Sequence, residues 1–399
     1  MNLKYFIYHI NSHEYSVHGR NNIQPIKKVI GLLILLIFFG CSNNHCNGQT
    51  DPKPTTAKSI KIAILLDTSN SMDGLIDQAK SQLWNIVNEL AKAKCDGIKP
   101  DLKIALYEYG NSKLAVSNGY IRQVSPLTND LDQISDDLFS LKTNGGYEYC
   151  GQVIESALKD LQWSHSEHDY QVIFIAGNEP FTQGNVDFHS SCADAKKHQV
   201  IVNTIFCGNF DEGVETFWKD GALLTGGQYL SIEQDRRTVY VETPYDDAIV
   251  KYNQQLNETY IYYGEAGQDK KFNQSRQDAN AGSFGKSNMV SRTISKSSHV
   301  YKNSSWDLVD ASKDKSFDVS KVQTEQLPSE MQKMNCLQQK QYIEKKTIER
   351  ETIVRQIHEL NIKREKYITE QSAQSEKGML DNAIVESVKK QAVSKSFVF

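Results

Sequence analysis

The residues best suited to bind a metal ion lie in one short turn, Asp67-Thr68-Ser69-Asn70-Ser71, which has the pattern D-x-S-x-S. Asp67 follows the apolar run 60–66, so this turn is expected at the carboxyl end of a buried strand. Mg²⁺ takes about six oxygen ligands at about 2.1 Å. One carboxylate and two neutral hydroxyls leave such an ion electron-poor, so it can accept a carboxylate from another molecule. The pattern therefore predicts a site for Mg²⁺ or another divalent cation at Asp67, Ser69 and Ser71.

A simpler interpretation of the same turn is that it caps a helix. Ser71 and Asp73 stand just before a helical pattern, and Ser and Asp are favoured at helix N-termini. The residue types alone do not separate capping from metal binding, so both interpretations stay open at this point.

The turn lies in a segment where apolar runs alternate with amphipathic helical patterns. This alternation predicts an α/β fold with a doubly wound, mostly parallel sheet, whose ligand sites lie at the carboxyl ends of the strands. Residues 60–264 are long enough to form a complete core. The predicted strands are 60–66, 101–109, 120–124, 170–175, 200–207 and 228–232, and the predicted helices are 73–94, 130–141, 152–163, 187–199, 214–224 and 246–260.

An apolar strand, the D-x-S-x-S turn, an amphipathic helix and then alternating strands and helices resemble the von Willebrand factor type A domain over residues 60–264. The resemblance implies a Rossmann-like sheet with one antiparallel edge strand, a metal-ion-dependent adhesion site, and protein partners that offer a carboxylate to the metal. Two later loops of the family supply a Thr and an Asp ligand, but this chain has Tyr147 and Gly177 there. The site therefore resembles a degenerate one, with Glu148 or Glu179 as replacement carboxylates if the backbone is shifted.

The first 41 residues are typical of an export leader with an extended N-terminus. Lys27 and Lys28 precede the apolar run 29–39, which is short for a membrane-spanning helix, and Gly40-Cys41 follows. The end of this segment resembles a bacterial lipobox, which implies a lipid on Cys41, a tether over 42–59, and a place in the bacterial cell envelope, at the outer membrane or the periplasmic side of a membrane. An uncleaved anchor and ordinary secretion are the alternatives.

Export would allow disulfides to form. Cys150 and Cys192 are expected near the same sheet edge and are the candidate pair, although sequence alone does not fix connectivity. A zinc site at His189, Cys192 and His198 is not favoured, because the two histidines do not share one helical face and tetrahedral zinc needs further ligands.

The C-terminal part of the chain is more polar than the domain before it. Residues 265–326 are rich in Gly, Ser, Asn, Gln and Lys and are predicted to be a polar linker. Residues 327–399 are predicted to be a helical tail, with helices at 328–371 and 379–393 forming a hairpin, a coiled-coil stalk that self-associates, or solvated helices. Charged residues at heptad core positions, Lys346, Arg350 and Arg364, interrupt the coiled-coil pattern.

The composition excludes several classes of protein. Of the 399 residues, 39 % are apolar and 24 % charged, and the net charge of −4 gives no overall footprint for nucleic acid. No G-x-S-x-G, H-E-x-x-H or paired-carboxylate signature indicates an enzyme. The sequence predicts an envelope lipoprotein whose von Willebrand A-like domain binds proteins, with or without a divalent cation. The alternative is a metal-independent envelope scaffold assembled through the helical tail.

Overall fold

The computed structural model describes residues 58–232, 241–372 and 379–399. The predicted leader with Cys41, and the tether up to residue 57, lie outside these ranges.

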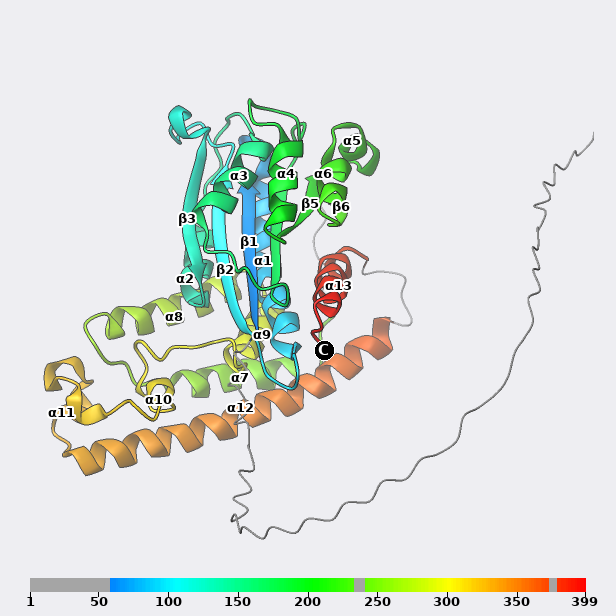
Figure 1. Cartoon of the computed structure of the whole chain (residues 1–399). Helices are drawn as coiled ribbons and strands as arrows, with labels where there is room; N and C mark the ends of the chain where they lie inside the picture. The colour runs from blue at the N-terminus through cyan, green and yellow to red at the C-terminus, as the bar shows by residue number, and fades with distance from the viewer. Residues whose placement is uncertain (1–57, 233–240, 373–378) are drawn as a thin grey trace, which may run out of the picture. The chain divides into compact units, whose positions relative to one another are not determined.

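One sheet with six strands forms the centre of the described chain (Figure 1). Its order is β3-β2-β1-β4-β5-β6, and every neighbouring pair is parallel except β2 with β3. The predicted doubly wound, mostly parallel α/β fold with one antiparallel edge strand is confirmed. The strands are β1 (Ser59–Asp67), β2 (Asp101–Tyr109), β3 (Ile121–Thr128), β4 (Tyr170–Gly177), β5 (Ile201–Cys207) and β6 (Tyr229–Ile232).

Helices cover both faces of this sheet because the side chains of its strands are apolar on both sides. In β1, Ile62 and Leu66 belong to the core on one face, and Ala63 and Leu65 to the core on the other. The first face packs against α1 (Asp73–Lys92) and α2 (Leu131–Ser140), and the second against α3 (Cys150–Asp160), α4 (Phe188–Lys197) and α6 (Trp218–Leu224). The short α5 (Phe210–Glu215) precedes α6.

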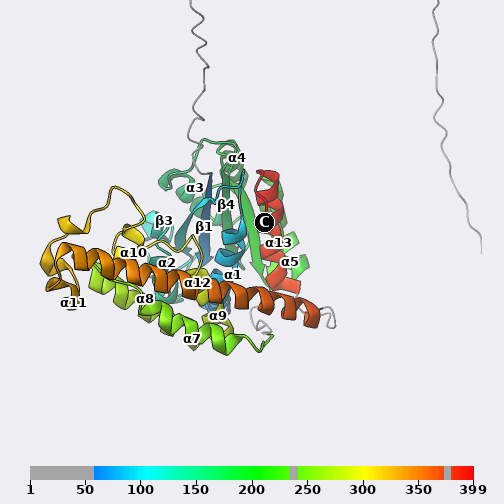
Figure 2. The ribbon, with the colours of Figure 1, turned by 90° about the horizontal axis from the view of Figure 1, so that it is seen from below.

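The remaining helices pack beside and beneath this layered domain. In Figure 2, α7 and α12 run side by side, and they are also in direct contact. These helices are α7 (Asp246–Asn257), α8 (Gly267–Ser283), α9 (Lys286–Lys296), α10 (Leu308–Ala311), α11 (Ser329–Gln332), α12 (Cys336–Ser372) and α13 (Met379–Ser394), and four short 3₁₀ turns are η1 (Asn70–Met72), η2 (Val116–Asn118), η3 (Val319–Lys321) and η4 (Thr324–Gln326).

The prediction of a polar linker over 265–326 was wrong. This segment contains α8 and α9, which pack on α2 and α1 respectively and on each other. Many of its polar side chains are buried and hydrogen-bonded: Gln277, for example, accepts from Ser135 at 2.9 Å and donates to Asp136 at 3.0 Å. The composition indicated a solvated linker because the segment is polar. Composition does not show that polar side chains can hydrogen-bond to one another inside the molecule, as they do here.

The helical tail was predicted in the right place, but it is neither a hairpin nor a free stalk. Helix α12 packs against α7, α9 and α10, and α13 packs against α1 and β6. Two of the three charges that interrupted the coiled-coil pattern have partners in the rest of the chain: Arg350 binds Asp307 at 2.6 Å, and Arg364 binds Asp246 at 3.1 Å. The third, Lys346, pairs with Glu349 on the same helix at 2.8 Å. Because Arg350 and Arg364 are paired in this way, the face of α12 that carries them packs on the chain's own domain.

Within the described ranges, no helix is both long and apolar enough to cross a lipid bilayer.

Candidate functional site

The carboxyl ends of β1, β2 and β4 meet at one edge of the sheet, which we call the upper edge. Asp67 is the last residue of β1, Gly110 follows β2, and Gly177 is the last residue of β4. Asp67 has no exposed surface. The predicted D-x-S-x-S turn therefore lies where a doubly wound sheet places its ligand sites.

The two serines of the turn form a chain of hydroxyl groups that begins at Asp67. The backbone N–H of Ser69 donates to Asp67 Oδ1 at 2.7 Å, and its hydroxyl donates to Oδ2 at 3.1 Å. Ser69 Oγ and Ser71 Oγ are 3.2 Å apart, and Asn178 Nδ2 donates to Ser71 Oγ at 3.1 Å. The structure thus brings Asp67, Ser69 and Ser71 together.

Helix capping does not explain this turn. Neither η1 nor α1 has a side-chain cap, because Ser71 is engaged as described above and Asp73 Oδ1 accepts from Thr143 Oγ1 at 2.6 Å. The capping interpretation was therefore wrong, and the polar side chains of the turn are directed to one another and to neighbouring loops.

Glu148 is the carboxylate that joins Asp67. It lies in the loop before α3, only 2 % of its surface is exposed, and it interacts directly with the Asp67 carboxyl group. The backbone N–H of Glu179 donates to Glu148 Oε2 at 3.3 Å, and the Glu148 N–H donates to Gln183 Oε1 at 2.5 Å. Of the two carboxylates predicted as replacements, the structure brings Glu148 into the site, whereas Glu179 is exposed and contributes its backbone.

The two carboxyl groups share one buried site. Burial raises the pKa of Asp67 well above its usual range, and the neighbouring Glu148 raises it further. Burial also raises the pKa of Glu148, against the hydrogen bonds it makes with Asp67 and Ser69. None of the main influences on either pKa is a lysine, arginine or histidine. Burial and mutual repulsion therefore both disfavour the state in which the two groups are charged, unless a cation joins them.

Gly110 is required by this arrangement. A Cβ atom at that position would lie 2.5 Å from Asp67 Oδ1 and 2.9 Å from Glu148 Cγ. Its φ of +79° is also in the left-handed region that favours glycine. The absence of a side chain at Gly110 leaves the space in which the two carboxyl groups meet.

The two departures from the family pattern have different structural consequences. A Cβ atom at Gly177 would lie 2.6 Å from the Tyr109 hydroxyl and 3.3 Å from Asp67 Cβ, so the family's aspartate has no room there. Tyr147, at the family's threonine position, is 60 % exposed, and its phenol ring contacts other tyrosines. Neither position supplies a ligand.

Tyr147 belongs to a cluster of three tyrosines that sequence analysis missed. The ring centroids of Tyr120, Tyr147 and Tyr149 are 6.0 to 6.1 Å apart in all three pairs. Gly184 makes room for the cluster, since a Cβ atom there would lie 2.7 Å from the Tyr149 ring. The sequence signal was the pair of tyrosines on either side of Glu148.

The predicted Cys150–Cys192 disulfide is not formed. Both residues are buried and free: Cys150 Sγ lies 3.8 Å from the Tyr109 hydroxyl, and Cys192 Sγ lies 3.5 Å from the Gly221 carbonyl oxygen. Burial raises the pKa of both thiols, to about 12 for Cys192. These cysteines behave as small core residues of α3 and α4.

The structure does not assemble the unfavoured zinc ligands either. His189 Nδ1 is 2.8 Å from Asp187, and His198 Nδ1 is 2.8 Å from the Asp194 carbonyl oxygen. Across the described ranges, no three or more His, Cys, Asp or Glu side chains are grouped as they would be around a metal ion. A cation at the upper edge would therefore depend on the two carboxyl groups together with the serine hydroxyls.

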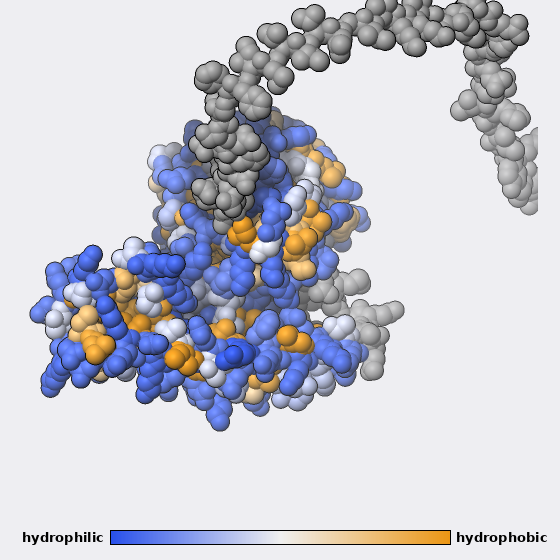
Figure 3. Space-filling view, turned by 60° about the horizontal axis from the view of Figure 1, so that its bottom comes forward, coloured by the Kyte–Doolittle hydropathy of each residue, from blue (hydrophilic) through white to orange (hydrophobic). Residues whose placement is uncertain are grey.

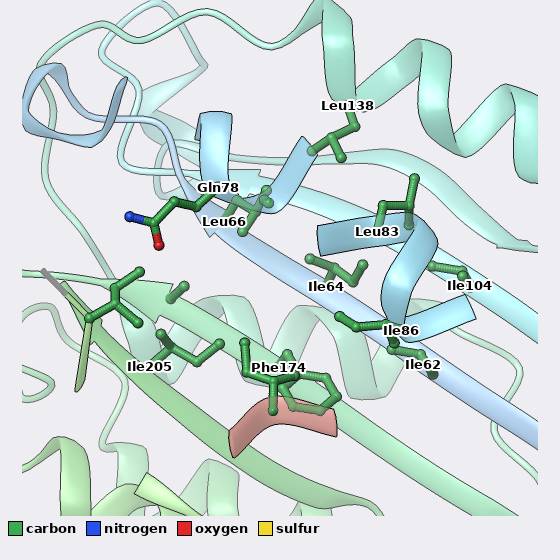
Figure 4. A pocket seen from close by; sticks show the side chains of 14 residues that line it. Ile62, Ile64, Leu66, Gln78, Leu83, Ile86, Ile104, Leu138, Phe174 and Ile205 are labelled. Carbon is green, nitrogen blue, oxygen red and sulfur yellow. The ribbon is translucent and has the colours of Figure 1, made fainter. Parts of the chain in front are cut away.

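An apolar cavity lies on the α1 side of the sheet (Figure 4). It has about 880 Å³ of space free of atoms, counted out to its open mouth. Ile62 and Leu66 of β1, Phe174 of β4 and Ile205 of β5 line it, and Gln78 brings the one polar side chain among the described lining residues. Such a lining can hold an apolar group but offers no chemistry for catalysis.

Comparisons with known proteins identify similar structures but no sequence family. A scan of protein-family models finds no match, and a search of curated proteins finds none. Three solved structures resemble this chain: the conserved hypothetical protein BatB from Bacteroides thetaiotaomicron, the SpRpn10 VWA domain, and an aerotolerance-related membrane protein from Bacteroides fragilis NCTC 9343. In that order, their sequence identities to this chain are 14 %, 16 % and 14 %, and their TM-scores are 0.34, 0.34 and 0.31. The matched regions cover 44 %, 45 % and 44 % of this chain. They cover 91 %, 90 % and 92 % of the respective known structures.

The strand order, the antiparallel β3 and the D-x-S-x-S turn at the end of β1 define the class. The described chain has the fold of a von Willebrand factor A-type domain, as its sequence pattern predicted.

Proposed function

We propose that this chain is a lipid-anchored protein of the bacterial cell envelope whose von Willebrand A-type domain binds a protein partner at its upper edge. In this proposal a divalent cation, Mg²⁺ or a similar ion, mediates the contact. The observation that carries the proposal is the buried pair of Asp67 and Glu148, which has no basic partner among its main interactions.

The residues at the upper edge fit a hard divalent cation. Asp67 and Glu148 would hold it with carboxylate oxygens, and Ser69 and Ser71 with hydroxyl oxygens, the ligand type that Mg²⁺ prefers. When bound, the cation would supply an open coordination position for a carboxylate of the partner. The chain's own part is to give up any proton held by Asp67 and Glu148 and to keep both serine hydroxyls turned toward the same point.

The tyrosine cluster supports protein binding at this edge. Tyr147 is exposed beside the carboxyl pair, and the packing of Tyr120 and Tyr149 against it restricts its motion. Tyrosine is enriched at protein interfaces because it buries a large area and loses few rotatable bonds. The cluster thus gives the proposed interface an apolar contact next to its polar one.

The scaffold alternative has less support. The inward faces of α12 and α13 are used within the chain, with Ile357 and Val388 buried in its main core. Their outward faces are largely charged, although Leu337, Ile348 and Ile362 on α12 and Val393 on α13 are more than half exposed. Assembly through the tail would have to use these few residues.

The cation part of the proposal can be tested by calorimetry with millimolar MgCl₂ or MnCl₂. The parent protein should release or absorb heat of binding, and Asp67→Ala should abolish it. Asp77→Ala is the matched control, because Asp77 is exposed on α1. The absence of any heat with the parent protein would overturn the metal site.

The partner part can be tested by pull-down from solubilised membranes with and without EDTA. We expect capture to be lost with EDTA and with Tyr147→Ala, and kept with Ile348→Glu/Ile362→Glu. Deleting the whole tail is a poor test, since it would remove buried core residues such as Phe397. Capture that resists EDTA but fails in the α12 double variant would favour the scaffold.

A further inference from the structure

The end of the sheet opposite the upper edge carries lysines and exposed apolar side chains together. We call it the base face and define it by Lys58, Lys94, Ile98, Lys99 and Val398. All five lie at the amino ends of β1 and β2 or on segments bonded to them: the N–H of Asp101, the first residue of β2, donates to the Lys58 carbonyl at 3.1 Å. Figure 2 views the molecule from this end.

The backbone of the base face is held in a fixed shape. Cys95 and Ile98 exchange two hydrogen bonds of 2.8 Å across Asp96 and Gly97, whose φ angles of +51° and +75° match a tight hairpin turn. Lys94 and Val398 likewise exchange two bonds of 2.8 Å. The turn and the 394–399 segment therefore present their side chains from a preformed surface.

Two apolar side chains project from this surface. Ile98 is 37 % exposed and Val398 is 60 % exposed. Figure 3, which brings the lower side forward, shows a mostly hydrophilic surface interrupted by hydrophobic patches. Two side chains such as Ile98 and Val398 are too few for a stable dimer but suit shallow insertion into a lipid interface.

The charge of the base face is uncompensated. Among the ion pairs of the described residues, none involves Lys58, Lys94 or Lys99. The nearby carboxylates are partly occupied, since Asp101 pairs with Lys302 at 2.8 Å and Asp169 accepts two bonds of 2.8 Å from Ser59. Asp96 is the exposed exception in the turn itself.

His299 lies close enough to Lys99 and Lys302 for their positive charges to affect its pKa. Burial, together with the charges of Lys99 and Lys302, lowers the pKa of His299 to about 4. The upper edge is of mixed charge, because the exposed carboxylates Glu179, Asp187, Asp211 and Glu212 share it with exposed Lys113 and Lys142. An anionic surface would therefore attract the base face more strongly than the upper edge.

We propose that the base face lies on the surface of an anionic membrane, with its lysines at the lipid phosphates and Ile98 and Val398 in the interface. The proposal rests on the anchored location proposed above. Residue 58 is the point at which the predicted tether enters the domain, and 17 residues from Cys41 span at most about 60 Å. Docking on the base face would leave the upper edge, with its carboxyl pair and tyrosines, turned away from the lipid and free to meet a partner.

The test compares full-length protein binding to vesicles of phosphatidylcholine alone and of phosphatidylcholine mixed with phosphatidylglycerol. Lys58→Glu/Lys94→Glu/Lys99→Glu should weaken binding to the anionic vesicles by about a hundredfold or more, since one lysine near such a surface contributes about fivefold. Lys113→Glu/Lys142→Glu/Lys219→Glu, which makes the same charge change elsewhere on the exposed surface, should have little effect. The leader's apolar segment contributes equally to all three proteins, so the differences isolate the lysines.

A second measurement reports orientation. Tryptophan introduced as Ile98→Trp should be quenched by brominated lipid, whereas Val116→Trp, in η2 beyond the upper end of β2, should not. Equal binding of parent and lysine variant to anionic vesicles, or equal quenching at both positions, would overturn the proposal. So would loss of an acidic protein partner, with vesicle binding kept, in the lysine variant. Each result leaves the EDTA test of the upper edge unaffected, and Cys41→Ala separately tests the anchor.

Discussion

Two groups of charged side chains are buried in this molecule, and they differ in how their charge is balanced. Between α2, α8 and α9, Arg292 and Lys296 meet Asp132 and Asp278, so two cations face two carboxylates. At the upper edge, Asp67 and Glu148 face each other with no cation among their main interactions. The charges of the first group balance one another in the folded chain, whereas the two carboxyl groups of the second have no opposite charge among their main interactions.

The balanced group is satisfied at almost every polar atom. Arg292 binds Asp278 at 2.5 Å, Asp132 at 2.8 Å and the Gln274 carbonyl at 2.9 Å, and its guanidinium lies 4.8 Å from the centre of the Trp84 ring. Although burial opposes it, the two cations hold the pKa of Asp278 well below its usual range. Such a group ties α8 and α9 to the domain and has no vacancy for a ligand.

The comparison teaches which buried charges to associate with function. A buried ion cluster that is neutral and fully hydrogen-bonded specifies how helices pack. A buried pair of like charges costs stability unless a proton or a cation joins it, so such a pair is a candidate binding site. Substitutions in the two groups should therefore have opposite effects on stability.

The largest effect is expected for Arg292→Met. Removing this cation leaves Asp132 with no ion partner and Asp278 with Lys296 alone in a buried site, which should lower the free energy of unfolding by about 3–5 kcal/mol. Urea denaturation measures this loss. A loss below about 1 kcal/mol would mean that the cluster is open to water and that the contrast with the upper edge is false.

A smaller effect of opposite sign is expected for Asp67→Asn in the presence of EDTA. Because the asparagine carries no charge to bury, the free energy of unfolding at neutral pH should rise by about 1–2 kcal/mol. Asp77→Asn on the exposed side of α1 is the matched control. If Asp67→Asn destabilises as strongly as Arg292→Met, the carboxyl pair is structural.

The pH dependence of stability gives a further check on the pair. Because the pKa values of Asp67 and Glu148 are raised in the folded protein, the folded state binds more protons than the unfolded state above about pH 4. In EDTA the stability of the parent should therefore fall as pH rises from about 4 through the raised pKa values, and Asp67→Asn should flatten this slope. Thermal melts across pH measure both. The same slope in both proteins would show that other groups cause it.

The smallest effect is expected for an ion pair at the surface. Lys286 and Asp247 lie 2.8 Å apart, with Asp247 almost fully exposed. Water and salt screen such a pair, so Lys286→Ala should change the melting temperature by no more than about 1 °C. The small change in melting temperature of this variant is the reference with which the effects of substitutions in the two buried groups are compared.

The sheet could be predicted from the sequence because its strands and helices have apolar periodicity. The run 60–66 and the pattern over 101–109 predicted β1 and β2 within a residue or so at each end. The segment 265–326 was wrongly predicted to be a linker, because polar residues such as Gln277 and Asp278 occupy the buried face of α8, where a helical pattern normally has apolar residues. Polar cores depend on pairing across distant segments, and no local pattern records that pairing.

The candidate site was predictable in its first half only. Asp67, Ser69 and Ser71 come from one turn, so their spacing revealed them. Glu148 was one of two candidates, and the choice between it and Glu179 depended on how the loop before α3 folds back over Gly110. The tyrosine cluster required three loops to meet, which sequence spacing does not show.

The aliphatic cavity beside β1 has a mechanical consequence. Unfolding eliminates internal voids, so the unfolded protein occupies slightly less volume than the folded one, and hydrostatic pressure favours it. The part of the cavity that a water molecule could enter, about 90 Å³, lies between α1 and the sheet beside Ile62, Leu66 and Phe174, whereas buried side chains such as Cys150 and Trp218 form the core of the opposite face. Under pressure, the layer of α1 should therefore move closer to the sheet than the helices on the opposite face do. Helix α1 follows directly from the D-x-S-x-S turn.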